Sequence, residues 1–131
     1  MRIKVITPER TVLDAQDVQH VLLPGEGGEL GILPRHVSMV SSLAMGRISV
    51  DLSGESLDIA TTGGFAEVFQ NRVTVLVDTA EKVSEIDVER ARQARKRAQE
   101  RLRRRAEEID EARALAALAR AANRLRVAGV E

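Results

Sequence analysis

The sequence has no cysteine, tryptophan or tyrosine, and Phe65 and Phe69 are its only aromatic residues. Without cysteine there is no disulfide framework, no thiolate nucleophile and no thiolate zinc site. With so few aromatic rings, base-stacking platforms, aromatic cages and an aromatic membrane belt are disfavoured. His20 and His36 are the only histidines, too few for a histidine metal site. We therefore expect no metal centre.

Long apolar runs and catalytic motifs are missing as well. No apolar run approaches the roughly 18 residues that a membrane-spanning helix needs. The first residues, from Met1 to Ile6, alternate like a β-strand, so we expect no signal or transit peptide. The sequence also lacks a P-loop, a cluster of metal-binding carboxylates and a credible Ser-His-Asp triad. These absences give little support to catalysis by this chain.

Charge is balanced over the whole chain but divided between its two halves. Residues 1–86 contain 7 basic and 12 acidic side chains, a net charge of −5. Residues 87–131 contain 13 basic and 8 acidic side chains, a net charge of +5. Because the composition changes near the same point, we predict two domains, at residues 1–84 and 85–131.

The first domain is predicted to consist of short β-strands separated by turn residues. The clearest strands are Ile3–Ile6, Val18–Leu23, Ile48–Leu52, Leu57–Thr61, Phe65–Phe69 and Val73–Val77. Short strands at spacings near ten residues indicate a compact antiparallel sandwich or barrel.

The second domain is predicted to be helical, because Ala, Arg and Glu dominate it and no Gly or Pro occurs before Gly129. Apolar residues recur at helical spacing along two segments: Val88, Ala91, Ala98 and Leu102, then Leu115, Leu118, Ala122 and Leu125. Ser84 or Asp87 can cap the first helix and Asp110 the second, with the break near residues 105–110. We predict an α-hairpin. Its alanine-rich stripes bury little apolar area, so we expect it to be a mobile element.

The most distinctive segment, GELGILPRH, extends from Gly28 to His36. Taken by itself it indicates a tight turn, in which Gly28 and Gly31 permit φ > 0 on either side of a short apolar strand that Pro34 ends. In that interpretation Glu29 is an exposed turn carboxylate and His36 a surface histidine.

The same segment closely resembles the signature of the ε subunits of F-type ATP synthases. Further similarities follow in the family's order: Thr7-Pro8, the run from Gly63 to Val68, the run from Val73 to Leu76, the segment from Ala80 to Asp87, and Asn123-Arg124-Leu125. The resemblance therefore covers essentially the whole chain. It implies an N-terminal antiparallel β-sandwich followed by a C-terminal two-helix antiparallel hairpin, the class that the residue pattern also predicts.

The resemblance implies partners as well. The sandwich of such a subunit binds the γ subunit and the c-ring at the foot of the central stalk. Glu29 matches a residue that contacts the c-ring, and His36 lies in the same loop, towards γ. The resemblance thus implies a non-catalytic, peripheral subunit at the cytoplasmic face of the bacterial cell membrane, which couples γ to the c-ring.

A second motif, IDVERA, extends from Ile86 to Ala91 and resembles the Ile/Leu-Asp-x-x-Arg-Ala sequence through which some bacterial ε subunits bind ATP. The chain repeats the pattern from Ile109 to Ala114, and both copies are also typical of a helix start with an aspartate cap. Both interpretations of the motif, as a helix cap and as part of a nucleotide site, are therefore kept.

Residues around this motif favour the nucleotide interpretation. The resemblance implies that Glu81, Ile86, Asp87 and Ala91 face the adenine, and that Arg90, Arg97, Arg120 and Arg124 surround the ribose and phosphates. A closed hairpin could bring four guanidiniums to one polyphosphate, which bidentate arginine suits. The alternative is an ordinary solvated basic face. ATP is expected as a regulatory ligand, not as a substrate.

A basic patch, defined as Arg101, Arg103, Arg104 and Arg105, follows on the first helix. Its usual role is a solvated helical face. The resemblance implies instead that an extended hairpin presents it to an acidic loop of the catalytic β subunits, beside the α subunits, and opposes ATP hydrolysis.

Two functions of other classes compete with this interpretation. An arginine-rich helical nucleic-acid-binding module on a β scaffold would also explain the basic helices, although the scarce aromatics and the acidic first half count against it. A small hydrolytic enzyme has only His20 and His36 to support it.

Overall fold

The computed structural model describes residues 1–104 and 111–130, and the chain divides into two compact units, Met1–Ser84 and Glu85–Glu131. The first unit contains β1 (Arg2–Ile6), β2 (Thr11–Ala15), β3 (His20–Gly25), β4 (Gly28–Ile32), β5 (Met39–Leu43), β6 (Gly46–Leu52), β7 (Glu55–Thr61), β8 (Gly64–Phe69), β9 (Arg72–Val77) and β10 (Ala80–Lys82). The short 3₁₀ helix η1 (Val83–Glu85) leads to α1 (Val88–Arg104) and α2 (Glu111–Val127). The two units are described separately below.

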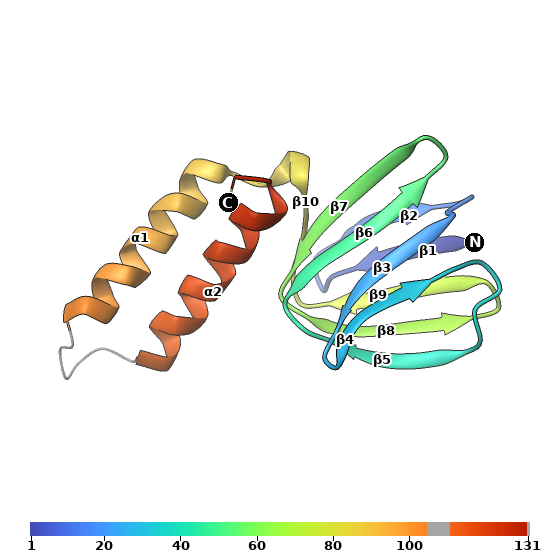
Figure 1. Ribbon diagram of the computed structural model, residues 1–131, viewed down its shortest axis with the longest axis horizontal. Helices are drawn as coiled ribbons and strands as arrows, with labels where there is room; N and C mark the ends of the chain where they lie inside the picture. The colour runs from blue at the N-terminus through green and yellow to red at the C-terminus, as the bar shows by residue number, and fades with distance from the viewer. Residues whose placement is uncertain (105–110, 131) are drawn as a thin grey trace. The chain divides into compact units, whose positions relative to one another are not determined.

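The strands of the first unit form a β-sandwich whose hydrogen-bonded order is β10-β7-β6-β3-β5-β8-β9-β1-β2, with β4 paired to β3 (Figure 1). Neighbouring strands are antiparallel except β1 and β9, which are parallel. The predicted fold class, a β-sandwich followed by two helices, is confirmed.

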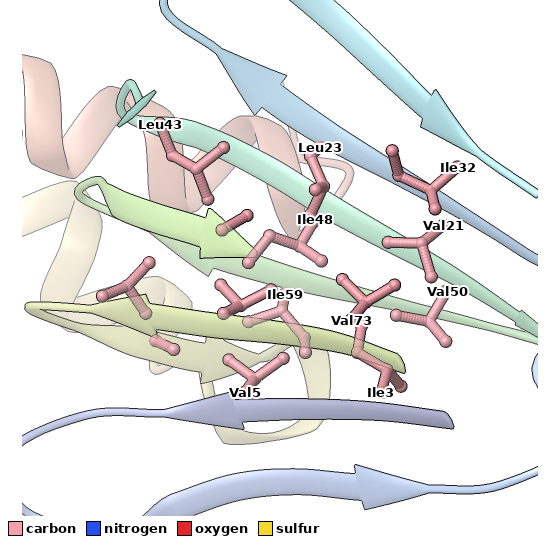
Figure 2. Packing of buried hydrophobic residues seen from close by; sticks show 14 of the residues in the cluster. Ile3, Val5, Val21, Leu23, Ile32, Leu43, Ile48, Val50, Ile59 and Val73 are labelled. Atoms are coloured by element: carbon pink, nitrogen blue, oxygen red, sulfur yellow. The ribbon is translucent and has the colours of Figure 1, made fainter. Parts of the chain in front are cut away.

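Alternation of side chains places the core between the two layers of the sandwich. In β9, Val73, Val75 and Val77 are buried, while Leu76 between them is exposed. The parallel register sets Ile3 and Val5 of β1 beside Val73 and Val75. Figure 2 shows Ile3, Val5 and Val73 directed into the same apolar cluster as Val21, Ile48 and Ile59 of the opposite layer, and Val75 belongs to that cluster as well. Each fully buried aliphatic side chain contributes about 1.5–3 kcal/mol.

Three strands, β2, β5 and β10, are absent from the sequence prediction. Their sequences, TVLDA, MVSSL and AEK, carry polar residues within the run. They form because neighbouring strands supply hydrogen bonds: β5 pairs with β8, and β10 pairs with β7. Such pairing is set by tertiary context more than by strand propensity.

The distinctive segment GELGILPRH differs in one detail from the prediction. Gly28 has a φ of 132°, as expected, but Gly31 has no positive φ. It lies within β4 opposite Leu22. A β-carbon at Gly31 would lie 3.4 Å from Nε2 of His20, so the glycine provides space beside that ring instead of a turn.

The second unit is an antiparallel helical hairpin (Figure 1). Asp87 caps α1, because its Oδ1 accepts a hydrogen bond of 3.0 Å from the backbone N–H of Arg90. The predicted cap at Asp110 and the break at residues 105–110 lie outside the described residues.

The buried face of the hairpin is rich in alanine. Ala91 and Ala98 of α1 are buried, and so are Ala114, Ala121 and Leu125 of α2. Of the predicted stripe on α2, Leu125 is buried as expected, but the prediction is wrong at Leu115, which is 51% exposed while the neighbouring Ala114 is buried. Small side chains allow helices to approach closely, so Ala114 takes the contact position at this end of α2 and the longer Leu115 lies outside it.

Candidate functional site

The sandwich presents an apolar surface on the outer side of β5, β8, β9 and β1, opposite to the core. The strand register arranges its outward side chains in rows across the layer. One row contains Ser42, Phe65, Leu76 and Ile6, and the next contains Val40, Glu67, Thr74 and Lys4. We call this surface the outer face and define it by Val40, Phe65, Phe69 and Leu76.

The four side chains of the outer face are more than half exposed: Val40 69%, Phe65 58%, Phe69 52% and Leu76 53%. Both aromatic residues of the protein therefore lie outside its core. Contiguous exposed apolar surface is uncommon on soluble domains and marks interaction sites. A groove of about 460 Å³ lies at the end of the outer face near Val40 and Phe69, and is lined by Ser38, Met39, Val40, Glu67, Val68 and Phe69.

The loop between β4 and β5, residues 33–38, extends this surface. It carries Leu33 and Val37, which are both well exposed. Arg35 lies in it with a φ of 67°. The backbone N–H of Arg35 donates a hydrogen bond of 2.9 Å to Oδ1 of Asn71 in the β8–β9 turn. The loop is thus held beside the strands of the outer face.

The structure places Glu29 and His36 near the two ends of the segment from β4 into this loop. Glu29 is exposed on β4, opposite Pro24. His36 is half-buried in the loop, and its Nδ1 lies 2.7 Å from the carbonyl oxygen of Val37. Neither side chain belongs to a cluster of metal-ligating groups in residues 1–104 and 111–130.

The arginines predicted to bind polyphosphate share one side of the hairpin. Each directly precedes a residue of the buried face: Arg90 precedes Ala91, Arg97 precedes Ala98, Arg120 precedes Ala121 and Arg124 precedes Leu125. An α-helix turns by about 100° per residue, so each of these arginines is rotated by the same angle, in the same sense along the chain, from the buried residue that follows it. Two antiparallel helices are related by an approximate two-fold axis perpendicular to the plane that contains them. Side chains with equal rotations on the two helices therefore project from the same side of that plane. We call this set the arginine face.

The arginines of the arginine face also differ in their position along the length of the hairpin. Arg90 is in the first turn of α1 and Arg124 in the last full turn of α2, so both lie at the same end (Figure 1). Arg113, in the duplicate motif, lies on the same side but at the opposite end. Arg92 follows Ala91 and therefore lies on the other side, where its Nη1 is 3.9 Å from Glu89 Oε2. The arrangement can present several guanidiniums to one anion.

The remaining predicted ATP residues are divided between the two units. Glu81 is half-buried in β10, in the first unit. Asp87 is exposed at the start of α1, whereas Ile86 and Ala91 are buried. Asp87 already acts as a helix cap, so its Oδ1 is engaged with the backbone.

Arg101 and Arg103 of the basic patch lie on different sides of α1. Arg101 and Arg103 are exposed in the last turn of α1, but two residues correspond to about 200° of rotation. Arg101 therefore lies on the side of Arg90 and Arg97, and Arg103 on the other side. Arg104 is the last residue of α1, and Arg105 lies outside the described residues.

The sequence prediction missed the outer face, although the strands carried a signal for it. In β8, Phe65 and Phe69 alternate with Ala66 and Val68, and in β9 Leu76 lies between Val75 and Val77. These strands are apolar on both faces, and only one face can enter the core. Strands with two apolar faces in a sandwich therefore indicate a covered outer surface.

Among the described residues, no helix is both long enough and apolar enough to cross a membrane.

Comparisons with known proteins give the same family for both units. The family described as "ATP synthase, Delta/Epsilon chain, beta-sandwich domain" matches residues 1–83, and "ATP synthase, Delta/Epsilon chain, long alpha-helix domain" matches residues 84–129. The ATP synthase epsilon chain of Desulforamulus reducens is 44% identical over 127 residues, covering 97% of this chain and 96% of the relative. That of Symbiobacterium thermophilum is 48% identical over 129 residues, covering 98% and 93%.

Solved structures agree in fold. A chain in the mitochondrial ATP synthase of Euglena gracilis, solved with OSCP, F1 and c-ring, superposes with a TM-score of 0.70 at 23% identity, covering 98% of this chain and 76% of that one. A chain in the central stalk and c-ring structure of Tetrahymena thermophila gives 0.62 at 14% identity, covering 98% and 96%. These findings confirm the family resemblance and do not support the nucleic-acid alternative.

Proposed function

The chain belongs to the ATP synthase delta/epsilon chain family, and on this basis we propose that it is a non-catalytic subunit of the central stalk. It couples the γ subunit to the c-ring and regulates ATP hydrolysis. The observation that carries the proposal is the outer face, where both phenylalanines and Leu76 are more than half exposed. Fully burying such a side chain is worth about 1.5–3 kcal/mol, so a partner that covers the exposed part gains roughly half of that for each.

In this proposal the γ subunit covers the outer face. The loop of residues 33–38, held by Asn71, lies at the border of the interface. His36 in this loop faces γ, and Glu29 on β4 contacts the c-ring. An interface of standard size buries about 800 Å² on each partner. Large apolar side chains near its centre then supply most of the binding energy.

Substitution on the outer face tests the coupling function. We expect Phe65→Gln and Leu76→Gln each to weaken binding to purified γ subunit by tenfold or more, because each removes a buried apolar contact. Val83→Gln is the matched control, since Val83 is an exposed apolar residue on η1, outside the outer face. Unchanged γ affinity in the two outer-face variants, with circular dichroism like the wild type, would remove this function from the face.

The hairpin is proposed to sense ATP. A closed hairpin presents the arginine face, and ATP bound there without hydrolysis stabilises the closed state by its differential affinity. In the other state the helices extend along γ, and the basic patch approaches an acidic loop of the catalytic β subunits, beside α. The contact between α1 and α2 is rich in alanine and buries little apolar area, so opening the hairpin costs little free energy. The subunit then works as a peripheral component at the cytoplasmic face of the bacterial membrane.

Removal of residues 85–131 tests this regulation. We propose that residues 1–84 fold independently, because their core contains side chains of the sandwich alone. The complex with this fragment should retain coupled ATP synthesis, while its ATP hydrolysis rises. If the truncated and the intact complex hydrolyse ATP at the same rate, the hairpin does not inhibit hydrolysis.

A further inference from the structure

The basic side chains of the sandwich are unevenly distributed. Residues 1–84 contain seven basic and eleven acidic side chains. Three of the seven, Arg2, Lys4 and Arg72, line one groove of about 290 Å³ on the outer side of β1 and β9, together with Ile6, Val73 and Thr74. We call Arg2, Lys4 and Arg72 the basic groove. It is a positive site on an acidic domain.

The strand register brings like charges together in this groove. The parallel pairing of β1 and β9 sets Arg2 directly opposite Arg72. Like charges directly opposite in a sheet are destabilising. Asp14 offsets this repulsion at Arg2, and a counter-charge from outside would relieve what remains at Arg72.

The counter-charges within the sandwich are too few to neutralise the groove. Asp14 accepts two hydrogen bonds of 3.0 Å from Nε and Nη2 of Arg2. This pairing lowers the pKa of Asp14. Lys4 is the cross-strand neighbour of Asp14, and its charge also lowers the pKa of that carboxylate, although no ion pair joins the two side chains. Arg72 forms no side-chain hydrogen bond or ion pair in the described part of the chain. Glu67 is separated from Lys4 by Thr74.

The basic groove is continuous with the outer face. Arg72 lies directly opposite Phe69 of β8, as well as Arg2 of β1. A partner that covers Phe69 therefore also covers Arg72. Burying a guanidinium without a counter-charge is strongly unfavourable, so a partner at this border must supply one.

We infer that the subunit covering the outer face presents an acidic segment, with aspartate or glutamate side chains, to Arg2, Lys4 and Arg72. This inference rests on the proposed docking of γ to the outer face and adds a charge requirement at one edge of it. Charge pairs at the rim of an interface act mainly on association rate and on orientation, while the apolar centre supplies affinity. The groove therefore fixes the direction in which the partner docks.

Association kinetics of the full chain with purified γ subunit test the inference. The variants are Arg72→Gln and Lys4→Gln, with Arg47→Gln as a matched control that lies on β6, in the opposite layer. At low salt we expect each groove variant to lower the association rate about three- to tenfold and the control to match the wild type. At 1 M salt, where the Debye length is about 3 Å, groove variants and wild type should associate at the same rate.

Other outcomes would overturn the inference. A deficit of Arg72→Gln that persists at 1 M salt, or an equal deficit for Arg47→Gln, would overturn the inference. If Phe65→Gln abolishes binding while both groove variants behave like the wild type, the inference fails and the docking function stands. Binding of the isolated chain to phosphatidylglycerol vesicles that is lost in Arg72→Gln would assign the groove to a lipid surface and overturn the proposal as well.

Discussion

Asn71 Oδ1 accepts a hydrogen bond of 2.9 Å from the backbone N–H of Arg35, 36 residues earlier in the chain. Both residues have positive φ, 61° for Asn71 and 67° for Arg35. The bond joins the loop of residues 33–38, which carries His36, to the turn between β8 and β9, whose strands form the outer face. Two parts of the proposed interface are therefore held together by one side chain.

Asn71→Gly tests the role of this bond, since glycine keeps the positive φ and removes only the acceptor. We expect faster hydrogen exchange at the Arg35 amide, a loss of stability of about 1 kcal/mol or less, and weaker γ binding. Gln70→Gly, at the preceding residue with a φ of 47°, is the control and should leave the Arg35 amide unchanged. Identical exchange in both variants would show that the loop does not depend on Asn71.

Calorimetric titration with ATP tests the arginine face. We expect Arg90→Ala or Arg124→Ala to weaken binding about ten- to a hundredfold, because a charge-assisted hydrogen bond contributes about 1.5–3 kcal/mol. Arg92→Ala is the control on the other side of α1, paired with Glu89. Arg113→Ala, at the far end of the hairpin, should bind nearly as the wild type does. Equal losses at Arg90 and Arg92 would indicate a diffuse basic surface, and no heat at millimolar ATP would exclude the site.

Two substitutions at Asp87 separate its cap from its proposed contact with adenine. Asp87→Ala should destabilise the start of α1 by about 0.5–2 kcal/mol, seen as faster exchange of the Arg90 amide. Asp87→Ser retains a capping oxygen and should restore that protection, yet bind ATP more weakly because the carboxylate is gone. Wild-type ATP affinity in Asp87→Ser would leave Asp87 as a helix cap alone.

The ion pair of Arg2 and Asp14 predicts a pH dependence with a definite sign. The hydrogen bonds from Arg2 lower the pKa of Asp14 in the folded state. Its contribution to stability is therefore complete above the unfolded pKa of about 3.9 and is lost as the pH falls through the lower folded value. The difference in unfolding free energy between wild type and Asp14→Asn should be constant at neutral pH and shrink below about pH 4. A difference that grows on acidification would contradict the assignment.

The sequence predicts most of this fold because its strands alternate clearly. Val73, Val75 and Val77 define one face of β9 without reference to any other strand. It does not predict β5, because Ser41 and Ser42 interrupt the apolar pattern and pairing with β8 determines the strand. On α2, spacing alone cannot distinguish Leu115 from Ala114 as the contact residue, because the choice depends on how closely the helices approach.

The candidate site is predictable to a different extent on each unit. The arginine face follows from helical periodicity and antiparallel packing, and both can be inferred from the spacing of residues in the sequence. The outer face depends on which side of a doubly apolar strand enters the core. Phe65 and Ala66 are both apolar, and only the assembled sandwich shows that Ala66 is buried and Phe65 exposed. The pairing of Arg2 with Arg72 likewise depends on strand register between β1 and β9, which are far apart in sequence.

Protection of single cysteines from maleimide tests the docking of γ to the outer face most directly, because the chain has no cysteine of its own. Ser42→Cys introduces a thiol on β5 opposite Phe65, and Ser56→Cys introduces one on β7, in the other layer. Our account predicts that saturating γ slows labelling of Ser42→Cys at least tenfold and leaves Ser56→Cys unchanged. Protection of Ser56→Cys with free labelling of Ser42→Cys in the same complex would contradict it.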